Sequence, residues 1–167
     1  GVEILISYPV NHVIEAAARA DIRTVIVRQE RIGLHMADAM SRLSSGKNLG
    51  VFAMQHGPGS ENAFGGVAQA FGDSVPILVL PMGYSRAAAH VTPNFNSTLN
   101  FRNVTKLSEP ITSADEISNV MRRAFTQLRN GRPAPVLVEI PYDLFAEEIS
   151  GEFSYKPTFS TRSGPDP

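Results

Sequence analysis

Glu30 stands where a side chain could take part in chemistry. It follows the β-forming run 24–27 and immediately precedes a helical pattern at 32–43. A carboxylate there can stabilise the helix N-terminus, which is a structural role. It can also point into the crevice beyond the strand ends, where parallel α/β sheets bind ligands, and share a proton with a bound heterocycle. The spacing alone leaves both interpretations open.

A glycine-rich turn, Gly57-Pro58-Gly59-Ser60-Glu61-Asn62, follows another β-forming run and opens a helical pattern. Glycines there permit a tight turn and a close approach of backbone to a ligand. The dinucleotide fingerprint also needs an acidic residue at the end of the next strand, but that strand ends Leu80-Pro81-Met82-Gly83. Pro58 further removes a backbone donor. A phosphate-binding role for this turn is therefore weakly supported.

His56 lies directly before that turn. It is either a surface or hydrogen-bonded histidine, or a side chain of the site. The sequence has no cysteine, no H-x-x-x-H or H-E-x-x-H spacing and no G-x-S-x-G or Walker lysine motif. Metal-dependent hydrolysis, serine hydrolysis and P-loop chemistry therefore have no support, and no metal site is expected in this chain.

The elements that must position these residues alternate between strands and helices. Apolar β-forming runs at 4–7, 24–27, 51–54, 77–80 and 136–140 predict strands covered on both faces. Helical patterns fall at 11–20, 32–43, 60–71 and 117–128, the last with a capping box from Ser113 to Glu116 and an end at Gly131 and Pro133. This alternation predicts a doubly wound α/β domain with a mostly parallel sheet of five or six strands and helices on both faces. The segment 104–107 is the candidate for the sixth strand, inside a long polar connection from 83 to 110.

Composition limits the class of protein. The 167 residues carry a net charge of -1 and are 43% apolar, which predicts one globular domain with no attraction for nucleic acid or anionic lipid. We expect a cytoplasmic protein without a membrane partner. The chain opens on a strand pattern and closes on a Ser/Gly/Pro-rich stretch. We therefore expect a domain over residues 1–150 that has been excised from a longer chain, with residues 151–167 as a linker toward a central domain.

Several blocks of sequence together resemble a known family. They are R-Q-E at 28–30 with H-M-A-D at 35–38, G-P-G-S-E-N at 57–62 and D-S-V-P-I at 73–77. In this order and spacing they are similar to the pyrimidine-binding domain of thiamine diphosphate enzymes, in the acetolactate synthase and 2-keto acid decarboxylase group. The resemblance extends from residue 1 to about residue 149.

The resemblance implies a role for particular residues. Glu30 would be the catalytic residue that activates the cofactor, by a hydrogen bond from its carboxyl to a ring nitrogen of the aminopyrimidine. Positions that match the family's cofactor side are Tyr8, Pro9, Gln55, Pro58 and Asn62. His56 departs from the small hydroxyl residue common there and is the substrate-side candidate. Val10 and Asn11 depart from the glycines usual after Tyr-Pro, which puts the shape of that loop in question.

The resemblance also implies cofactors and partners. Thiamine diphosphate would be held with Mg²⁺ by a separate domain that carries a G-D-G motif, and no Gly-Asp-Gly occurs in this sequence. The active site would form with the diphosphate-binding domain of a neighbouring chain, in a homodimer or homotetramer acting on a 2-keto acid. Binding of FAD stays open, because the flavin-holding domain is not in this chain. The alternatives are a stand-alone subunit of a two-subunit decarboxylase and a non-catalytic nucleotide-binding module.

Overall fold

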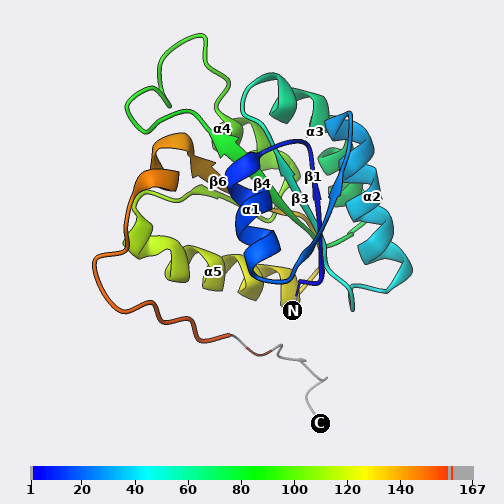
Figure 1. Ribbon diagram of the computed structural model, residues 1–167. Coiled ribbons are helices and arrows are strands. Elements are labelled where there is room, and N and C mark those ends of the chain that lie inside the picture. Colours follow the sequence, from blue (N-terminus) through cyan, green and yellow to red (C-terminus); the bar gives the residue numbers. More distant parts are fainter. Residues whose placement is uncertain (1, 158, 160–167) are drawn as a thin grey trace.

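One parallel sheet of six strands organises the molecule (Figure 1). The computed structural model describes residues 2–157 and residue 159. The strand order is β2-β1-β3-β4-β6-β5, and every neighbouring pair is parallel. The predicted doubly wound α/β fold is confirmed. The strands are β1 (Ile4–Ser7), β2 (Arg23–Ile26), β3 (Gly50–Met54), β4 (Ile77–Gly83), β5 (Leu107–Pro110) and β6 (Val136–Pro141).

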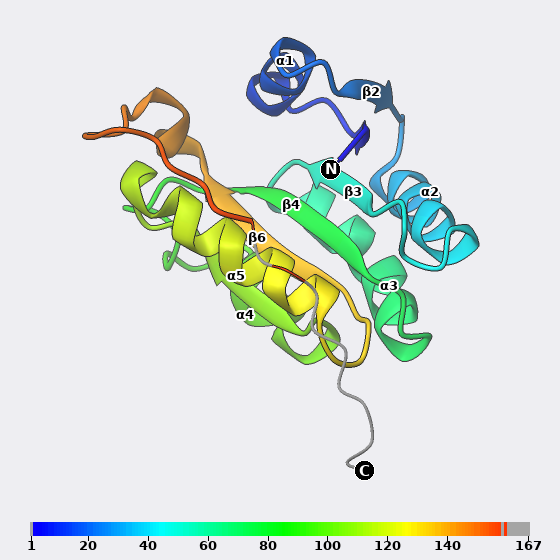
Figure 2. The same ribbon diagram turned by 90° about the horizontal axis from the view of Figure 1, so that it is seen from below.

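Helices cover both faces of this sheet (Figure 2). Each face has its own apolar core. On one face lie α1 (Asn11–Arg19) and α5 (Ile117–Arg129), whose apolar stripes pack on the sheet. On the other lie α2 (Glu30–Leu43), α3 (Pro58–Gly72) and the short α4 (Ser97–Asn100), which continues into the 3-10 turn η1 (Phe101–Val104). Two further 3-10 turns are η2 (Ala114–Glu116) and η3 (Tyr142–Ala146). Within the described ranges, none of the helices is both long and apolar enough to span a membrane.

Three details of the predicted elements are wrong. Strand β4 continues through Pro81 to Gly83 because Met82 and Gly83 still pair with β6. The sixth strand is β5 at 107–110, whereas 101–104 is the 3-10 turn η1. The edge strand β2 is partly exposed rather than covered on both faces.

The predicted capping box at Ser113 is also absent. The Ser113 side chain makes no capping hydrogen bond, because the chain first makes the turn η2 before α5 begins. The backbone N–H of Ala114 instead donates to Oε1 of Glu147 at 2.9 Å. A side chain that comes from beyond η3 thus replaces the local cap.

Glycines allow α2 to lie close to its neighbours. A Cβ on Gly66 of α3 would lie 2.4 Å from Cδ2 of Leu34, which is fully buried in α2. A Cβ on Gly33 of α2 would lie 2.4 Å from the ring of Phe52 in β3. A side chain at either position would force Leu34 or Phe52 to move. Gly66 therefore allows the close approach of α3 to α2, and Gly33 that of α2 to β3. Helices α2 and α3 carry Glu30 and Asn62.

Neighbouring glycines of α3 offer a direct test of this packing. We expect Gly66→Ala to lower the free energy of unfolding by about 1–3 kcal/mol, the usual cost of overpacking a core. Gly65→Ala is the matched control, because nothing lies within 4 Å of a Cβ there. It should be neutral or stabilise by up to about 1 kcal/mol through helix propensity. Denaturant unfolding of both variants measures the difference, and equal effects would contradict the close α2–α3 contact.

Candidate functional site

The candidate site lies at the carboxyl ends of β1 and β3. Strands β1 and β3 are neighbours in the sheet. Strand β2 lies on the far side of β1, and β4, β6 and β5 lie in this order on the far side of β3. The strand order therefore reverses between β1 and β3, and a crevice forms there in open parallel sheets. Tyr8 and Pro9 follow β1 into this crevice, and Gln55 to Gly59 follow β3.

The turn after β3 requires glycine at position 57. Gly57 has a φ of 57°, and a Cβ on it would lie 2.8 Å from the hydroxyl of Tyr84. Both the backbone angle and the close hydroxyl exclude a side chain. Pro58 then begins α3, where its missing N–H is no loss and its fixed φ suits the first helical turn. The turn is thus held in one shape by its own residue types.

Glu30 is the first residue of α2 and is only 8% exposed. Its Oε2 accepts a hydrogen bond of 2.7 Å from Nδ2 of Asn62 in α3. Its Oε1 faces Gly59, where a Cβ would lie 3.1 Å away. The carboxyl therefore stands at a helix N-terminus and also faces the glycine turn. Because residue 59 is glycine, there is room beside Oε1 of Glu30.

The turn after β1 is tied to the turn after β3. The backbone N–H of Tyr8 donates to the carbonyl of Ala53 at 3.0 Å. The Nε2 of Gln55 donates to the carbonyl of Pro9 at 3.4 Å. These bonds bring Tyr8, Pro9 and Gln55 together, and the bond between Glu30 and Asn62 joins α2 to the helix that begins at Pro58.

His56 packs against Tyr84, a residue that sequence reasoning did not select. Their rings lie 4.5 Å apart at an angle of 64°. The Nδ1 of His56 is buried and has no hydrogen-bond partner among the described residues. Buried polar atoms are normally hydrogen-bonded, so this nitrogen is one of two side-chain exceptions among the described residues, the other being Oγ1 of Thr24. No signal in the sequence connects Tyr84 with position 56, because the two follow different strands.

Glu139 is a second buried carboxyl close to the site and was also missed. It is 7% exposed within β6, and it is the one acidic residue in the apolar run 136–140. That interruption of an apolar strand is the signal that could have found it. Burial raises the pKa of Glu139, while hydrogen bonds from Ser97 and from the backbone of Thr98 act in the opposite direction.

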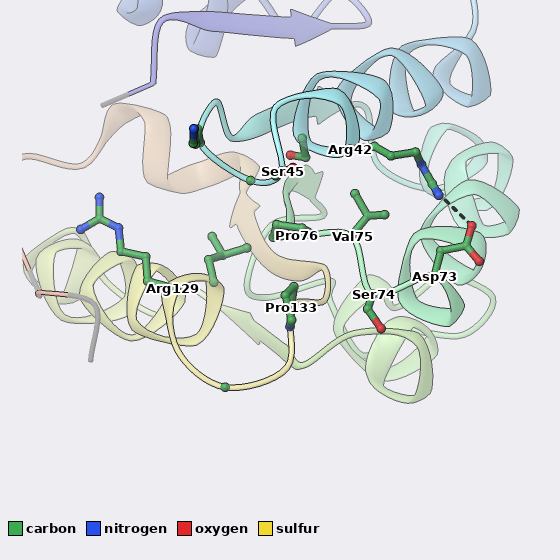
Figure 3. A pocket seen from close by; sticks show the side chains of 13 residues that line it. Arg42, Ser45, Asp73, Ser74, Val75, Pro76, Arg129 and Pro133 are labelled. Carbon is green, nitrogen blue, oxygen red and sulfur yellow. Dashed lines mark hydrogen bonds and ion pairs between the residues drawn. The ribbon is translucent and has the colours of Figure 1, made fainter. Parts of the chain in front are cut away.

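A polar cleft lies at the amino ends of the strands, opposite to this site, and is not part of it (Figure 3). It lies where α2, α3 and α5 end, and its lining includes Arg42, Asp73, Ser74 and Arg129. Arg42 binds Asp38 at 2.7 Å and Asp73 at 2.9 Å. Cations at helix C-termini balance the partial negative charge of the last carbonyls, so the basic lining has a structural explanation. Over residues 2–157 and 159, no group of three or more His, Asp or Glu side chains is placed to hold a metal ion.

The fold and the site together define an α/β domain that presents a buried carboxyl beside a glycine turn at a sheet switch point. A family model described as "Thiamine pyrophosphate enzyme, N-terminal TPP binding domain" matches residues 1–106, more than half of the chain. The chain belongs to this family, and the resemblance seen in the sequence is confirmed.

Two proteins with similar sequences are both named acetolactate synthase. The acetolactate synthase isozyme 3 large subunit of Escherichia coli is 32% identical over 152 residues, which are 84% of this chain and 26% of that protein. The chloroplastic acetolactate synthase 3 of Brassica napus is 35% identical over 153 residues, 86% of this chain and 23% of that protein. The chain thus spans about a quarter of the length of these relatives.

A solved structure has the same fold. The benzoylformate decarboxylase of Polynucleobacter necessarius superposes with a TM-score of 0.81 at 22% sequence identity. The match covers 99% of this chain and 32% of that one. It supports the α/β architecture described above.

Glu139 should make stability depend on pH. Its pKa in the folded state is raised above the ordinary value of 4.5. The stability contributed by this carboxyl is therefore fully present below the unfolded pKa and is lost as pH rises through the folded pKa. Glu139→Gln cannot ionise, so we expect it to lose less stability than the wild type between about pH 4 and about pH 8. Thermal unfolding across this range measures the effect, with Glu109→Gln as the control. Parallel curves for wild type and Glu139→Gln would contradict it.

Proposed function

We propose that this chain forms the pyrimidine-binding half of a thiamine diphosphate site, with Glu30 as the residue that contacts and activates the aminopyrimidine. The observation that carries the proposal is the Glu30 carboxyl itself, buried, held by Asn62 through one oxygen and facing Gly59 with the other. A carboxyl fixed in this way can share a proton with a ring nitrogen of a bound heterocycle.

The residues present fit such a group. Gly59 carries no side chain to fill the space beside Oε1 of Glu30. Tyr8, Pro9, Gln55, Pro58 and Asn62 would line the bound pyrimidine, and His56 would lie on the substrate side. Thiamine diphosphate supplies, when bound, the electron sink needed to break the bond next to a 2-keto group. The contribution of this chain is to bind the ring, orient it and hold a proton at the Glu30 carboxyl.

The complete protein is proposed to supply the rest of the site. The diphosphate-binding domain of a neighbouring chain would hold the diphosphate and Mg²⁺, in a homodimer or homotetramer in the cytoplasm. The names of the relatives support a 2-keto acid substrate, with decarboxylation and carboligation both open. The division into a domain at 1–150 and a linker at 151–167 stays a prediction, and residues 158 and 160–167 lie outside the described residues.

Replacement of Glu30 tests the proposed function. In the complete protein, Glu30→Gln should lower the turnover of a 2-keto acid by at least about 100-fold, because general acid–base groups contribute that much or more. The amide oxygen of Gln still accepts the hydrogen bond from Asn62, so the fold should persist. The measurement is steady-state release of CO₂ from pyruvate with thiamine diphosphate and Mg²⁺ present, together with the condensation product.

The matched control is Glu61→Gln, an exposed carboxyl in the first turn of α3. It should leave turnover within about two-fold of the wild type, since exposed surface substitutions have small effects. Near-normal turnover of Glu30→Gln would remove the role given to Glu30. Product analysis also separates decarboxylation alone from carboligation.

A further inference from the structure

A chain of buried polar groups connects Glu139 with the turn after β3. The hydroxyl of Ser97 in α4 donates to Oγ of Ser60 in α3 at 3.1 Å. The hydroxyl of Ser60 donates to the carbonyl of Gln55 at 3.3 Å. At the other end, Ser97 and the backbone of Thr98 hydrogen-bond the carboxyl of Glu139. Ser60, Ser97 and Glu139 are 0%, 1% and 7% exposed, so the chain is shielded from water.

Strand β4 is shaped to leave room for this carboxyl. A Cβ on Gly83 would lie 2.8 to 2.9 Å from Cγ, Cδ and Oε1 of Glu139. Gly83 pairs with Pro141, two residues beyond Glu139 in β6. Burial of an acidic side chain costs free energy unless hydrogen bonds replace its contacts with water. Here Ser97 and the backbone of Thr98 supply these hydrogen bonds.

Ser97 is the link between Glu139 and Ser60. Each serine hydroxyl has a single hydrogen to donate, and Ser60 donates its hydrogen to the carbonyl of Gln55. The hydroxyl of Ser97 lies within reach of both Oγ of Ser60 and the carboxyl of Glu139 and can donate to either. The carboxyl also accepts hydrogen bonds from the backbone of Ser97 and Thr98, so it holds the start of α4, and with it Ser97, in place.

We propose that Glu139 is a positioning residue for the cofactor-side turn and acts through Ser97 and Ser60 on the carbonyl of Gln55. The inference rests on the proposed function, because Gln55 lies on the cofactor side of the site. The Cβ of Gln55 lies 3.3 Å from the Cβ position of Gly59, which is itself 3.1 Å from Oε1 of Glu30. A displaced Gln55 would therefore change the space beside the Glu30 carboxyl.

The charged surroundings of Glu139 differ from those of its neighbour on β5. His90, in the segment after β4, favours the ionised form of Glu139 when it is itself charged. The segment α4 contributes uncharged residues only. Glu109 of β5 is bound instead by Arg123 of α5 at 3.1 Å. Val138, which pairs with Glu109, belongs to the apolar core of the α5 face, and Glu109 lies on the same face of the sheet. Glu109 therefore serves as an acidic control outside the series of hydrogen bonds from Glu139 to Gln55.

The test uses the complete protein without cofactor, and then with thiamine diphosphate and Mg²⁺ added. Ser60→Ala and Ser97→Ala each break the chain, Glu139→Leu removes its origin, and Glu139→Gln keeps a donor and an acceptor of the same shape. The readouts are amide hydrogen exchange of the peptide that covers residues 55–59 and calorimetric titration of the cofactor. The controls are Glu109→Gln and Ser41→Ala. The buried hydroxyl of Ser41 accepts a hydrogen bond from the N–H of Gly50, at the amino end of β3 and therefore far from the turn that follows this strand.

We expect Ser60→Ala and Ser97→Ala to raise exchange in 55–59 by about five-fold and to weaken cofactor binding by a similar factor, as loss of one buried hydrogen bond does. Glu139→Leu should have at least the same effect, and Glu139→Gln should stay within about two-fold of the wild type. Ser41→Ala should lower thermal stability without changing exchange in this turn.

Unchanged exchange in Ser60→Ala and Ser97→Ala would overturn the positioning role, even if Glu139→Leu failed to fold. So would failure of Glu139→Gln to restore wild-type exchange, or an equal rise in Ser41→Ala. The exchange measurement needs no cofactor. If wild-type protein bound no thiamine diphosphate, the proposed function would be contradicted. The exchange measurement would still decide whether Glu139 positions the turn.

Discussion

The close approach of α2 to α3 is the constraint on which the rest of the site depends. Gly66 lets the fully buried Leu34 enter the interface, and Gly33 lets α2 lie against the ring of Phe52. With the two helices this close, the amide of Asn62 donates to the carboxyl of Glu30 at 2.7 Å. Two residues without side chains thus allow α2, the helix that carries Glu30, to lie close to α3 on one side and to β3 on the other.

The site is supported from the sheet as well as from the helices. The turns after β1 and β3 meet because the strand order reverses between these strands, and Gln55 joins them through the carbonyl of Pro9. Behind the turn after β3, buried hydroxyls lead from Gln55 to Glu139 on β6. Side chains in a site are precise only when the groups behind them are fixed, and here the support extends across two strands.

Family membership agrees with this arrangement and also sets its limits. The matched family model describes an N-terminal thiamine pyrophosphate binding domain, and the relatives named acetolactate synthase are about four times as long as this chain. The described residues provide a carboxyl, an amide and a glycine turn, which suit a heterocycle. They do not gather a metal-binding group of acidic or histidine side chains within 2–157 and 159.

The sequence by itself determined the fold class and the parallel sheet, because apolar periodicity is a local signal. It also pointed to Glu30 and to the turn 57–62, but spacing left their roles open, and the role proposed for Glu30 came from the family resemblance. It did not determine that β4 passes through Pro81, since pairing with β6 overrides the local preference of proline. Nor did it connect His56 with Tyr84, or Glu139 with Ser97 and Ser60. These contacts join residues from 28 to 42 positions apart in the sequence, and a local pattern carries no information on such pairs. Only the tertiary structure decided them, because the order of the strands and the packing of the helices determine which side chains meet.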